Sequence, residues 1–178
     1  DGLADNLIFS IGEDHEGALW IGTRKGLNRR KDGTLATYTK KDGLPSDIVT
    51  AIFTDSTGAL WIGTRAGISK WRDGRFKTYT TEDGLSNNVI RAITEDRRHN
   101  IWIGTAGGGL NRFDGKRFEV FDSRRGLSND VVLDIHADAD GTLWVGTNGG
   151  GLNRFKDGRF TAFTTRNGLP DDAVFRIL

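Results

Sequence analysis

Short runs of β-prone residues, each bounded by polar turn residues, cover most of the chain. In residues 42–82 the turns are Asp55-Ser56-Thr57-Gly58, Arg65-Ala66-Gly67 and Asp73-Gly74. Asp-Gly between β-prone residues is a strong hairpin signal, because glycine accepts a positive φ without steric cost. No window shows a helical period, so the pattern predicts four short strands in this stretch. The predicted strands span residues 48–54, 59–64, 68–71 and 75–80.

The four-strand pattern recurs at a fixed period. Its clearest marker is the phrase Leu60-Trp61-Ile62-Gly63-Thr64 of the second copy, and the four tryptophans of this phrase lie 41, 41 and 42 residues apart. A Gly-Leu pair opens five copies, at Gly2, Gly43, Gly84, Gly126 and Gly168. Four-stranded repeats of this length are typical of β-propeller blades. The copies span about residues 1–41, 42–82, 83–124 and 125–166, with a partial fifth copy at 167–178.

Both faces of the Trp strand are apolar. In the second copy Leu60 and Ile62 point to one face and Trp61 to the other, because side chains alternate along a strand. Each face needs a cover, which blades stacked against one another supply. No composition shift or linker divides the chain. We therefore predict an all-β fold, a β-propeller of four-stranded antiparallel blades, with four blades plus one extra strand in a single array over residues 1–178.

The partial fifth copy bears on assembly. It repeats the first predicted strand of each copy, but no Trp strand follows it. Propellers usually have about 4 to 8 blades. We therefore expect that the four blades do not form a self-contained monomeric ring. Either they belong to a longer propeller, or further copies of the chain complete a larger ring or exchange the terminal strand. The absence of Met indicates a processed, excised or engineered chain.

Composition excludes several classes of function. The 25 basic and 24 acidic residues nearly cancel, whereas a nucleic-acid-binding protein usually carries a basic stripe. There is no Cys, so disulfides, thiolate catalysis and Cys-ligated zinc are excluded. No apolar run reaches the roughly 18 residues of a membrane span. The three histidines have no metal-ligand spacing, and no Gly-x-Ser-x-Gly elbow occurs. We expect no cofactor, metal site or catalytic residue.

Several columns of the repeat together resemble the two-component regulator propeller repeat. In the third copy they are Trp102-Ile103-Gly104-Thr105, Gly109-Leu110-Asn111-Arg112-Phe113 and Asp114-Gly115, and that copy opens with Gly84-Leu85-Ser86-Asn87-Asn88-Val89. The resemblance covers nearly the whole chain. It implies blades like those of seven-bladed propellers in the extracytoplasmic sensor part of bacterial hybrid histidine kinases, many of which sense oligosaccharides. It therefore implies a periplasmic or extracytoplasmic location. The repeat is also similar to blades of propeller lyases.

The turns after the Trp strands are the candidate ligand site. They vary in sequence on a constant frame, and with the connections between copies they are expected to share one rim. The predicted ligand-binding residues are Arg24, Lys25, Arg65 and Asn148. The glycines of the longer turns, such as Gly107 and Gly108, would either present backbone N–H groups to an anion or simply supply positive φ.

Two acidic columns each have a functional and a structural interpretation. A ring of oxygens at the start of each copy would bind a cation or sugar hydroxyls, or else form Asx turns. This column is Asn6, Asp47, Asn88, Asp130 and Asp172. The second column lies in the first hairpin of each copy, and its residues are expected to form the turn. Asp138-Ala139-Asp140-Gly141 resembles the start of a calcium loop but lacks the later ligands of such a loop. The second column comprises Asp14, Asp55, Asp96 and Asp138.

Other positions are expected to serve the scaffold. A basic column on the third strand is expected to pair with acidic groups, and comprises Arg29, Lys70, Arg112 and Arg154. Trp71 stands where other copies have Arg or Phe, and packing between blades is favoured over sugar stacking. We therefore predict a non-catalytic, ligand-sensing propeller module. The alternatives are a self-assembling structural fragment and, below it, a lyase or hydrolase.

Overall fold

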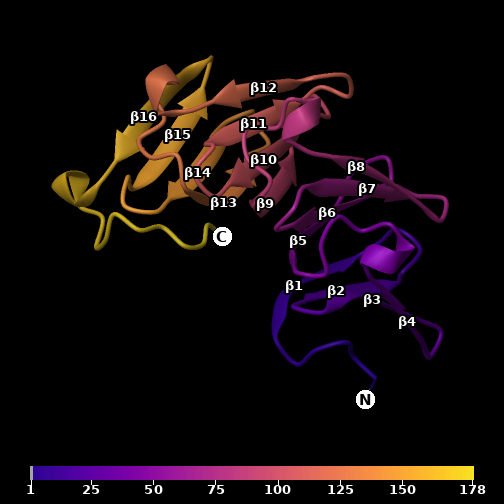
Figure 1. Ribbon diagram of the computed structural model, residues 1–178. Coiled ribbons are helices and arrows are strands. Elements are labelled where there is room, and N and C mark those ends of the chain that lie inside the picture. Colours follow the sequence, from indigo (N-terminus) through magenta and orange to yellow (C-terminus); the bar gives the residue numbers. More distant parts are fainter. Residues whose placement is uncertain (1) are drawn as a thin grey trace. The chain divides into compact units, whose positions relative to one another are not determined.

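The computed structural model describes residues 2–178, and these form four antiparallel four-stranded sheets whose strands follow sequence order (Figure 1). We call the sheets blades 1 to 4. Blade 1 contains β1 (Ile8–Glu13), β2 (Leu19–Thr23), β3 (Gly26–Lys31) and β4 (Thr34–Tyr38). Blade 2 contains β5 (Val49–Thr54), β6 (Leu60–Thr64), β7 (Ile68–Arg72) and β8 (Arg75–Tyr79). The strands predicted for residues 42–82 are confirmed to within a residue at each end.

The other two blades repeat this order. Blade 3 contains β9 (Ile90–Glu95), β10 (Ile101–Thr105), β11 (Leu110–Phe113) and β12 (Phe118–Phe121). Blade 4 contains β13 (Val132–Ala137), β14 (Leu143–Thr147), β15 (Leu152–Lys156) and β16 (Arg159–Phe163). The all-β fold of four propeller-type blades is thus confirmed. The expected extra strand after blade 4 is represented only by one bridge, between Asn148 and Ala173.

The chain divides into two compact units. The first covers the residues up to Thr80 together with Asn88–Ile90, and the second covers Thr81–Asn87 and Arg91–Leu178. A 3₁₀ turn follows the fourth strand of every blade. These turns are η1 (Lys40–Asp42), η2 (Thr81–Asp83), η3 (Ser123–Arg125) and η4 (Thr165–Asn167). Among residues 2–178, no helix is long and apolar enough to cross a membrane.

The Gly-Leu pairs of the second to fifth copies close these turns. Thr39 begins η1 as a cap that accepts a hydrogen bond from the Lys41 N–H, and Gly43 ends it in the left-handed conformation with φ 108°. Gly126 and Gly168 end η3 and η4 in the same way, with φ 97° and 98°. Because L side chains are strained at such φ values, the glycine that marks every copy is required by the backbone.

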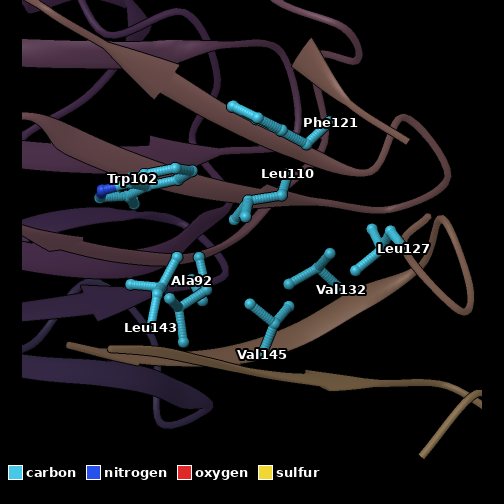
Figure 2. Close-up of a cluster of buried hydrophobic side chains, with 9 residues drawn as sticks. Ala92, Trp102, Leu110, Phe121, Leu127, Val132, Leu143 and Val145 are labelled. Carbon is cyan, nitrogen blue, oxygen red and sulfur yellow. The ribbon is translucent and has the colours of Figure 1, made fainter. Parts of the chain in front are cut away.

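The core of each unit lies between its two blades. In the second unit, Trp102, Leu110 and Phe121 of blade 3 lie against Val132 and other apolar residues of blade 4 (Figure 2). In the first unit, the same arrangement buries Trp20 and Leu27 against Leu60 and Ile62 of blade 2. The Trp of one blade also meets an aromatic residue on the third strand of the next. The ring centroids are 5.0 Å apart for Trp20 and Trp71, and 5.6 Å apart for Trp102 and Phe155. Trp71 therefore packs between blades, as predicted.

A glycine in each Trp strand receives a side chain from the following copy. A Cβ built on Gly22 would lie 2.8 Å from Cγ1 of Val49, and one built on Gly104 would lie 2.5 Å from Cγ1 of Val132. Both distances are far shorter than a real Cβ contact, so only glycine fits. Four such pairs occur within the two units. They are Gly22–Val49, Gly63–Ile90, Gly104–Val132 and Gly146–Val174.

A buried Asn on the third strand of blades 1, 3 and 4 fastens the start of its own copy, whereas blade 2 has Ser69 at this position. Asn111 Oδ1 accepts from the Ser86 N–H at 3.0 Å, and its Nδ2 donates to Ser86 Oγ at 2.7 Å. Asn153 and Ser128 repeat both contacts. In the first copy Ala4 replaces this serine, so Asn28 accepts from the Ala4 N–H while its buried Nδ2 has no hydrogen-bond partner. This column was not predicted from the sequence.

We predict that Gly22→Ala lowers the free energy of unfolding by about 1–3 kcal/mol, because the added methyl group overpacks the contact with Val49. In the double variant with Val49→Ala the two losses should be less than additive, because the shorter side chain relieves the clash. Urea denaturation followed by Trp fluorescence measures both. Strict additivity would show that the clash is not the cause.

We also predict that Ala4→Ser raises the free energy of unfolding by about 1 kcal/mol, since the new hydroxyl supplies the missing acceptor for Asn28 Nδ2. Ser128→Ala is the matched control and should lower it by a similar amount, because it orphans Asn153 Nδ2. Thermal and urea unfolding measure both variants. If Ala4→Ser left the free energy of unfolding unchanged while Ser128→Ala lowered it, this account of Asn28 would be contradicted.

Candidate functional site

Arg24 and Lys25 lie together in the turn between β2 and β3. Their nitrogens approach one oxygen of Asp5, at 3.3 Å for Arg24 Nη2 and 3.4 Å for Lys25 Nζ. The carboxylate is buried, yet the two basic side chains remain 56% and 65% exposed. The Leu7 N–H, aided by both cations, holds the pKa of Asp5 below its usual range against the opposing effect of burial. The result is a fixed carboxylate that positions two solvent-facing cations.

The other two predicted ligand residues occupy the equivalent turns of other blades. Arg65 is exposed in the turn between β6 and β7, in the same compact unit as Arg24 and Lys25. The position equivalent to Asp5 is Ser46 in that copy, so Arg65 lacks a carboxylate there. Asn148 is exposed between β14 and β15 and belongs to the second unit. Of the four residues, Arg24 and Lys25 are the pair that the structure brings onto one partner.

The glycine-rich turns do not offer free amides to an anion. The N–H groups of Gly107 and Gly109 both donate to the Asp130 carbonyl, at 3.1 and 2.8 Å. Those of Gly149 and Gly151 donate to the Asp172 carbonyl in the same way, at 3.0 and 2.7 Å. The interpretation of these amides as an anion-binding nest is therefore wrong. They join each turn to the start of the next copy, which confirms that turns and connections share a rim.

The acidic column at the start of each copy also serves the fold. Asp47 Oδ1 accepts from the Lys40 N–H at 2.7 Å, and Asp130 Oδ1 accepts from the Ser123 N–H at 2.7 Å. Asp172 makes the same contact with the Thr165 N–H at 2.6 Å. These carboxylates fasten the 3₁₀ turns and do not form Asx turns. The Asx-type turns come one residue earlier, at Asp5, Ser46, Asn129 and Asp171. The Asx-turn role predicted for this column therefore belongs to the preceding residue of each of these copies.

The second acidic column binds the tryptophans. The indole N–H donates to the carboxylate of Asp14, Asp55, Asp96 or Asp138 in the respective blade, at 2.7 Å in blade 1 and 2.8 Å in the others. In blade 4, whose first hairpin resembles a calcium loop in sequence, Asp140 Oδ2 accepts from Lys156 Nζ at 2.6 Å and Oδ1 accepts from the Thr142 N–H. The hairpin interpretation therefore holds. Within residues 2–178 no cluster of three or more His, Cys, Asp or Glu side chains suits a metal ion.

The basic column of the third strand completes this arrangement. Lys70 Nζ lies 3.4 Å from Asp55 and 5.0 Å from the centre of the Trp61 ring. Arg29 lies 5.5 Å above Trp20, with its Nε 3.9 Å from Asp14. Arg112 lies over Trp102 and pairs with Glu119. Pairing of this column with acidic groups is confirmed for Arg29, Lys70 and Arg112, so these cations belong to the scaffold.

The three histidines occupy different positions of the repeat, and each contacts a different neighbour. His99 occupies a hairpin turn with φ 63°, and its Nδ1 lies 3.0 Å from Glu95. His136 lies 3.3 Å from Asp138. His15 lies beside Gly58, whose built Cβ would contact the imidazole. No described contact joins two of them into an acid–base pair.

A second rim feature was not predicted from the sequence. A hollow of about 860 Å³ in the second unit is lined by the turn residues Gly107 and Gly108 and by the residues around η3. Its charged groups are Asp122, Arg124, Arg125 and Asp130. Arg124 Nε donates to Asp122 at 2.8 Å, which holds the guanidinium at the edge of the hollow. In the sequence, the basic pair at 124–125 is the one indication of this hollow. Only the structure shows that the pair lies beside the turn containing Gly107 and Gly108.

We predict that Asp55→Asn lowers the free energy of unfolding at pH 7 by about 2 kcal/mol, because an amide NH₂ would face the Trp61 N–H. Burial raises the pKa of Asp55, but hydrogen bonds from Thr57, Trp61 and Ala59 outweigh it and lower the pKa overall. The unfolded state then binds more protons, so this stability is present above pH 4 or so and is lost as pH falls further.

The variant should therefore show a smaller loss of stability on acidification below about pH 4 than the parent chain. Urea titrations between pH 7 and pH 2 measure the difference. Asp73→Asn is the control, because Asp73 is 91% exposed at a hairpin turn and should leave the profile unchanged. Equal acid sensitivity of parent and Asp55→Asn would contradict the role assigned to the carboxylate.

Comparisons with solved structures support the fold. The extracellular domain of a hybrid two component system from B. thetaiotaomicron is similar over 94% of this chain, with 25% identity and a TM-score of 0.57. The chain spans 30% of that protein's length. The extracellular domain of a one component system from the same organism matches 96% of the chain at 22% identity and a TM-score of 0.57, over 33% of its own length.

Enzymes share the same fold. A catalytically inactive virginiamycin B lyase from Staphylococcus aureus, solved with quinupristin, matches 92% of this chain and 57% of its own length. Its identity is 21% and its TM-score 0.73. At this identity the likeness concerns the fold alone. A search of curated protein sequences gives no significant match.

The repeat itself matches a family profile four times. The profile describes the two component regulator propeller, and its matches cover residues 2–25, 43–66, 84–107 and 126–149. Each match runs from the Gly-Leu pair through the Trp strand to the rim turn. Together the matches cover more than half of the chain. The chain therefore belongs to the two component regulator propeller family.

Proposed function

We propose that this chain is a non-catalytic sensor module that works outside the cytoplasm and binds an oligosaccharide at the rim of its blades. The observation that carries the proposal is the pair of solvent-facing cations, Arg24 and Lys25, held on the buried carboxylate of Asp5. Membership of a regulator propeller family and similarity to extracellular domains of sensor proteins support the location and the sensing role.

The chemistry of the rim suits a hydroxyl-rich or carboxylated ligand. Guanidinium and ammonium groups are strong donors, and sugar hydroxyls and carboxylates accept from them. Because Asp5 fixes both cations, less side-chain freedom is lost when a ligand binds. Arg65 presents a third donor from the equivalent turn of the adjacent blade, and Asn148 offers an amide in the second unit. A ligand that contacts two turns would hold their blades together, which is how binding would become a signal.

The non-catalytic role rests on the same contacts. The acidic column of the hairpins is committed to the tryptophans, and its basic partners to those carboxylates. These groups therefore serve the fold. The enzymes that share the fold keep a lyase or hydrolase as the lower alternative.

A second candidate function is structural. Four large apolar side chains at the start of the chain are exposed, which favours assembly of further copies into a larger ring. They are Leu7, Ile8, Phe9 and Ile11.

Isothermal titration of the full chain against a panel of neutral and uronic-acid oligosaccharides tests the sensing proposal. The double variant Arg24→Ala/Arg65→Ala should weaken binding at least about tenfold, because charged hydrogen bonds to the ligand are lost. Arg75→Ala/Lys116→Ala removes the same charge from exposed hairpins and should bind normally. Equal affinity of the two double variants would refute the assigned residues. Conversion of any sugar, followed by mass spectrometry, would refute the non-catalytic role.

A further inference from the structure

Strand β1 lacks a contact that every other copy of this strand makes. Ile8 stands at the position that Val49, Ile90 and Val132 occupy in the later blades. Those three side chains are fully buried against the glycine of a preceding Trp strand, whereas Ile8 is 42% exposed. Ile11 of the same strand is 59% exposed. The first blade thus exposes an apolar strand. The equivalent strands of the later blades pack against the glycine of a Trp strand.

The last glycine of this kind, Gly146 in blade 4, is covered by the segment 173–178. Val174 lies against Gly146, its N–H donates to the Thr147 carbonyl at 3.0 Å, and the Ile177 N–H donates to Asp134 Oδ2 at 2.8 Å. Figure 1 shows the segment as the yellow trace that ends at the C label. It forms no strand beyond the single bridge at Ala173, and Phe175 remains 72% exposed. The cover is therefore one short segment that forms no strand ladder with blade 4.

The two occupants are chemically equivalent. Strand β1 reads Ile8-Phe9-Ser10-Ile11, and the segment reads Val174-Phe175-Arg176-Ile177. Both place a β-branched residue for the glycine and an Ile three positions later. In the first unit the Ile52 N–H, at the position of Ile11 and Ile177, donates to Ser10 Oγ at 3.0 Å. Ile52 and Ile177 thus make equivalent contacts. Each donates its backbone N–H to a side chain on the first strand of the preceding blade, Ser10 or Asp134.

We propose that strand β1 of one copy docks on the Gly146 face of blade 4 in a second copy, and that segment 173–178 covers this face until it is displaced. The inference names the contact on which the structural candidate function rests, and it does not depend on ligand binding at the rim. The partner is a second copy because this chain carries both halves of the contact, and because the interface continues the packing seen between blades.

A second copy would contact more of blade 4 than the segment does. In both units the Trp of one blade packs against the third strand of the next, as Trp20 does with Trp71. The incoming blade 1 has the exposed Arg30 at that position. Its guanidinium would lie over Trp144, a favourable cation–π pair. The tethered segment has the advantage of an effective concentration in the millimolar range. Docking of a second copy is therefore favoured at high protein concentration or once the segment is released.

Mass photometry and sedimentation of the full chain test the competition. Val174→Asp should release the segment and lower the concentration for half assembly at least about tenfold. Phe175→Asp places the same charge on an exposed side chain of the segment and should leave assembly unchanged. Adding Ile8→Asp to Val174→Asp should return the chain to a monomer. Circular dichroism and a cooperative melt establish that each variant is folded.

A disulfide identifies the contact itself, because the chain has no other Cys. A Cβ on Gly12 would lie 3.6 Å from Cβ of Ile52, within the range for a disulfide. Gly12→Cys/Ile52→Cys is therefore the control and should cross-link within one chain. His136→Cys/Ile11→Cys carries the equivalent pair for two copies, because His136 and Ile11 stand at the positions of Gly12 and Ile52.

In the Val174→Asp background we expect this second pair to give covalently linked dimers and larger species on non-reducing gels, with little linkage in either single-Cys variant. A folded Val174→Asp chain that stays monomeric would overturn the proposal. So would a link between residues 11 and 136 that forms within one chain. Assembly without the link would overturn this interface, yet leave the structural candidate function standing.

Discussion

The distance between stacked blades is set by one close approach, that of a β-branched side chain to the glycine of the preceding Trp strand. Gly22 receives Val49, and Gly104 receives Val132, at separations that leave no room for a Cβ. The Trp stands two residues before the glycine and so points to the same face. Each blade thus presents a projecting ring beside a recess, and the next blade fits both. Burial of the aromatic layer depends on this fit, because a blade pushed away by one methyl group would lose contact along the whole face.

Each buried Trp carries an indole N–H that needs a hydrogen-bond acceptor, and other repeated positions of the blade supply it. The indole N–H needs an acceptor, which the Asp of the first hairpin supplies at 2.7–2.8 Å. A partly buried carboxylate in turn favours a cation, which Arg29 and Lys70 provide in the first unit. Charged columns that recur in every copy are therefore part of the scaffold. The residues proposed to bind a ligand lie where the copies differ, at the rim turns that carry Arg24, Lys25 and Arg65.

The proposed sensing and the proposed assembly would use different surfaces of the same repeat. The rim turns are joined to the next copy through backbone hydrogen bonds such as those from Gly107 and Gly109 to Asp130. Side chains on the turns are consequently free to vary while the frame stays constant. The stacking faces have no such freedom, since each must match a neighbour. If a ligand binds at the rim as proposed, the rim residues can vary without a change in the fold.

The sequence by itself determined the period, the four strands of each blade, the hairpin turns and the need for stacking, because these follow from local φ preferences and from alternation of apolar residues. It also pointed correctly to Trp71 as a packing residue and to the pairing of Arg29, Lys70 and Arg112 with carboxylates. Only the tertiary structure decided which polar atoms meet across copies. The glycine amides near residue 107 bind a carbonyl, Asp47 fastens η1, and Asn28 lacks an acceptor because Ala4 stands opposite it. Hydrogen bonds between residues far apart in the chain depend on positions within a few tenths of an ångström, and no local pattern encodes them.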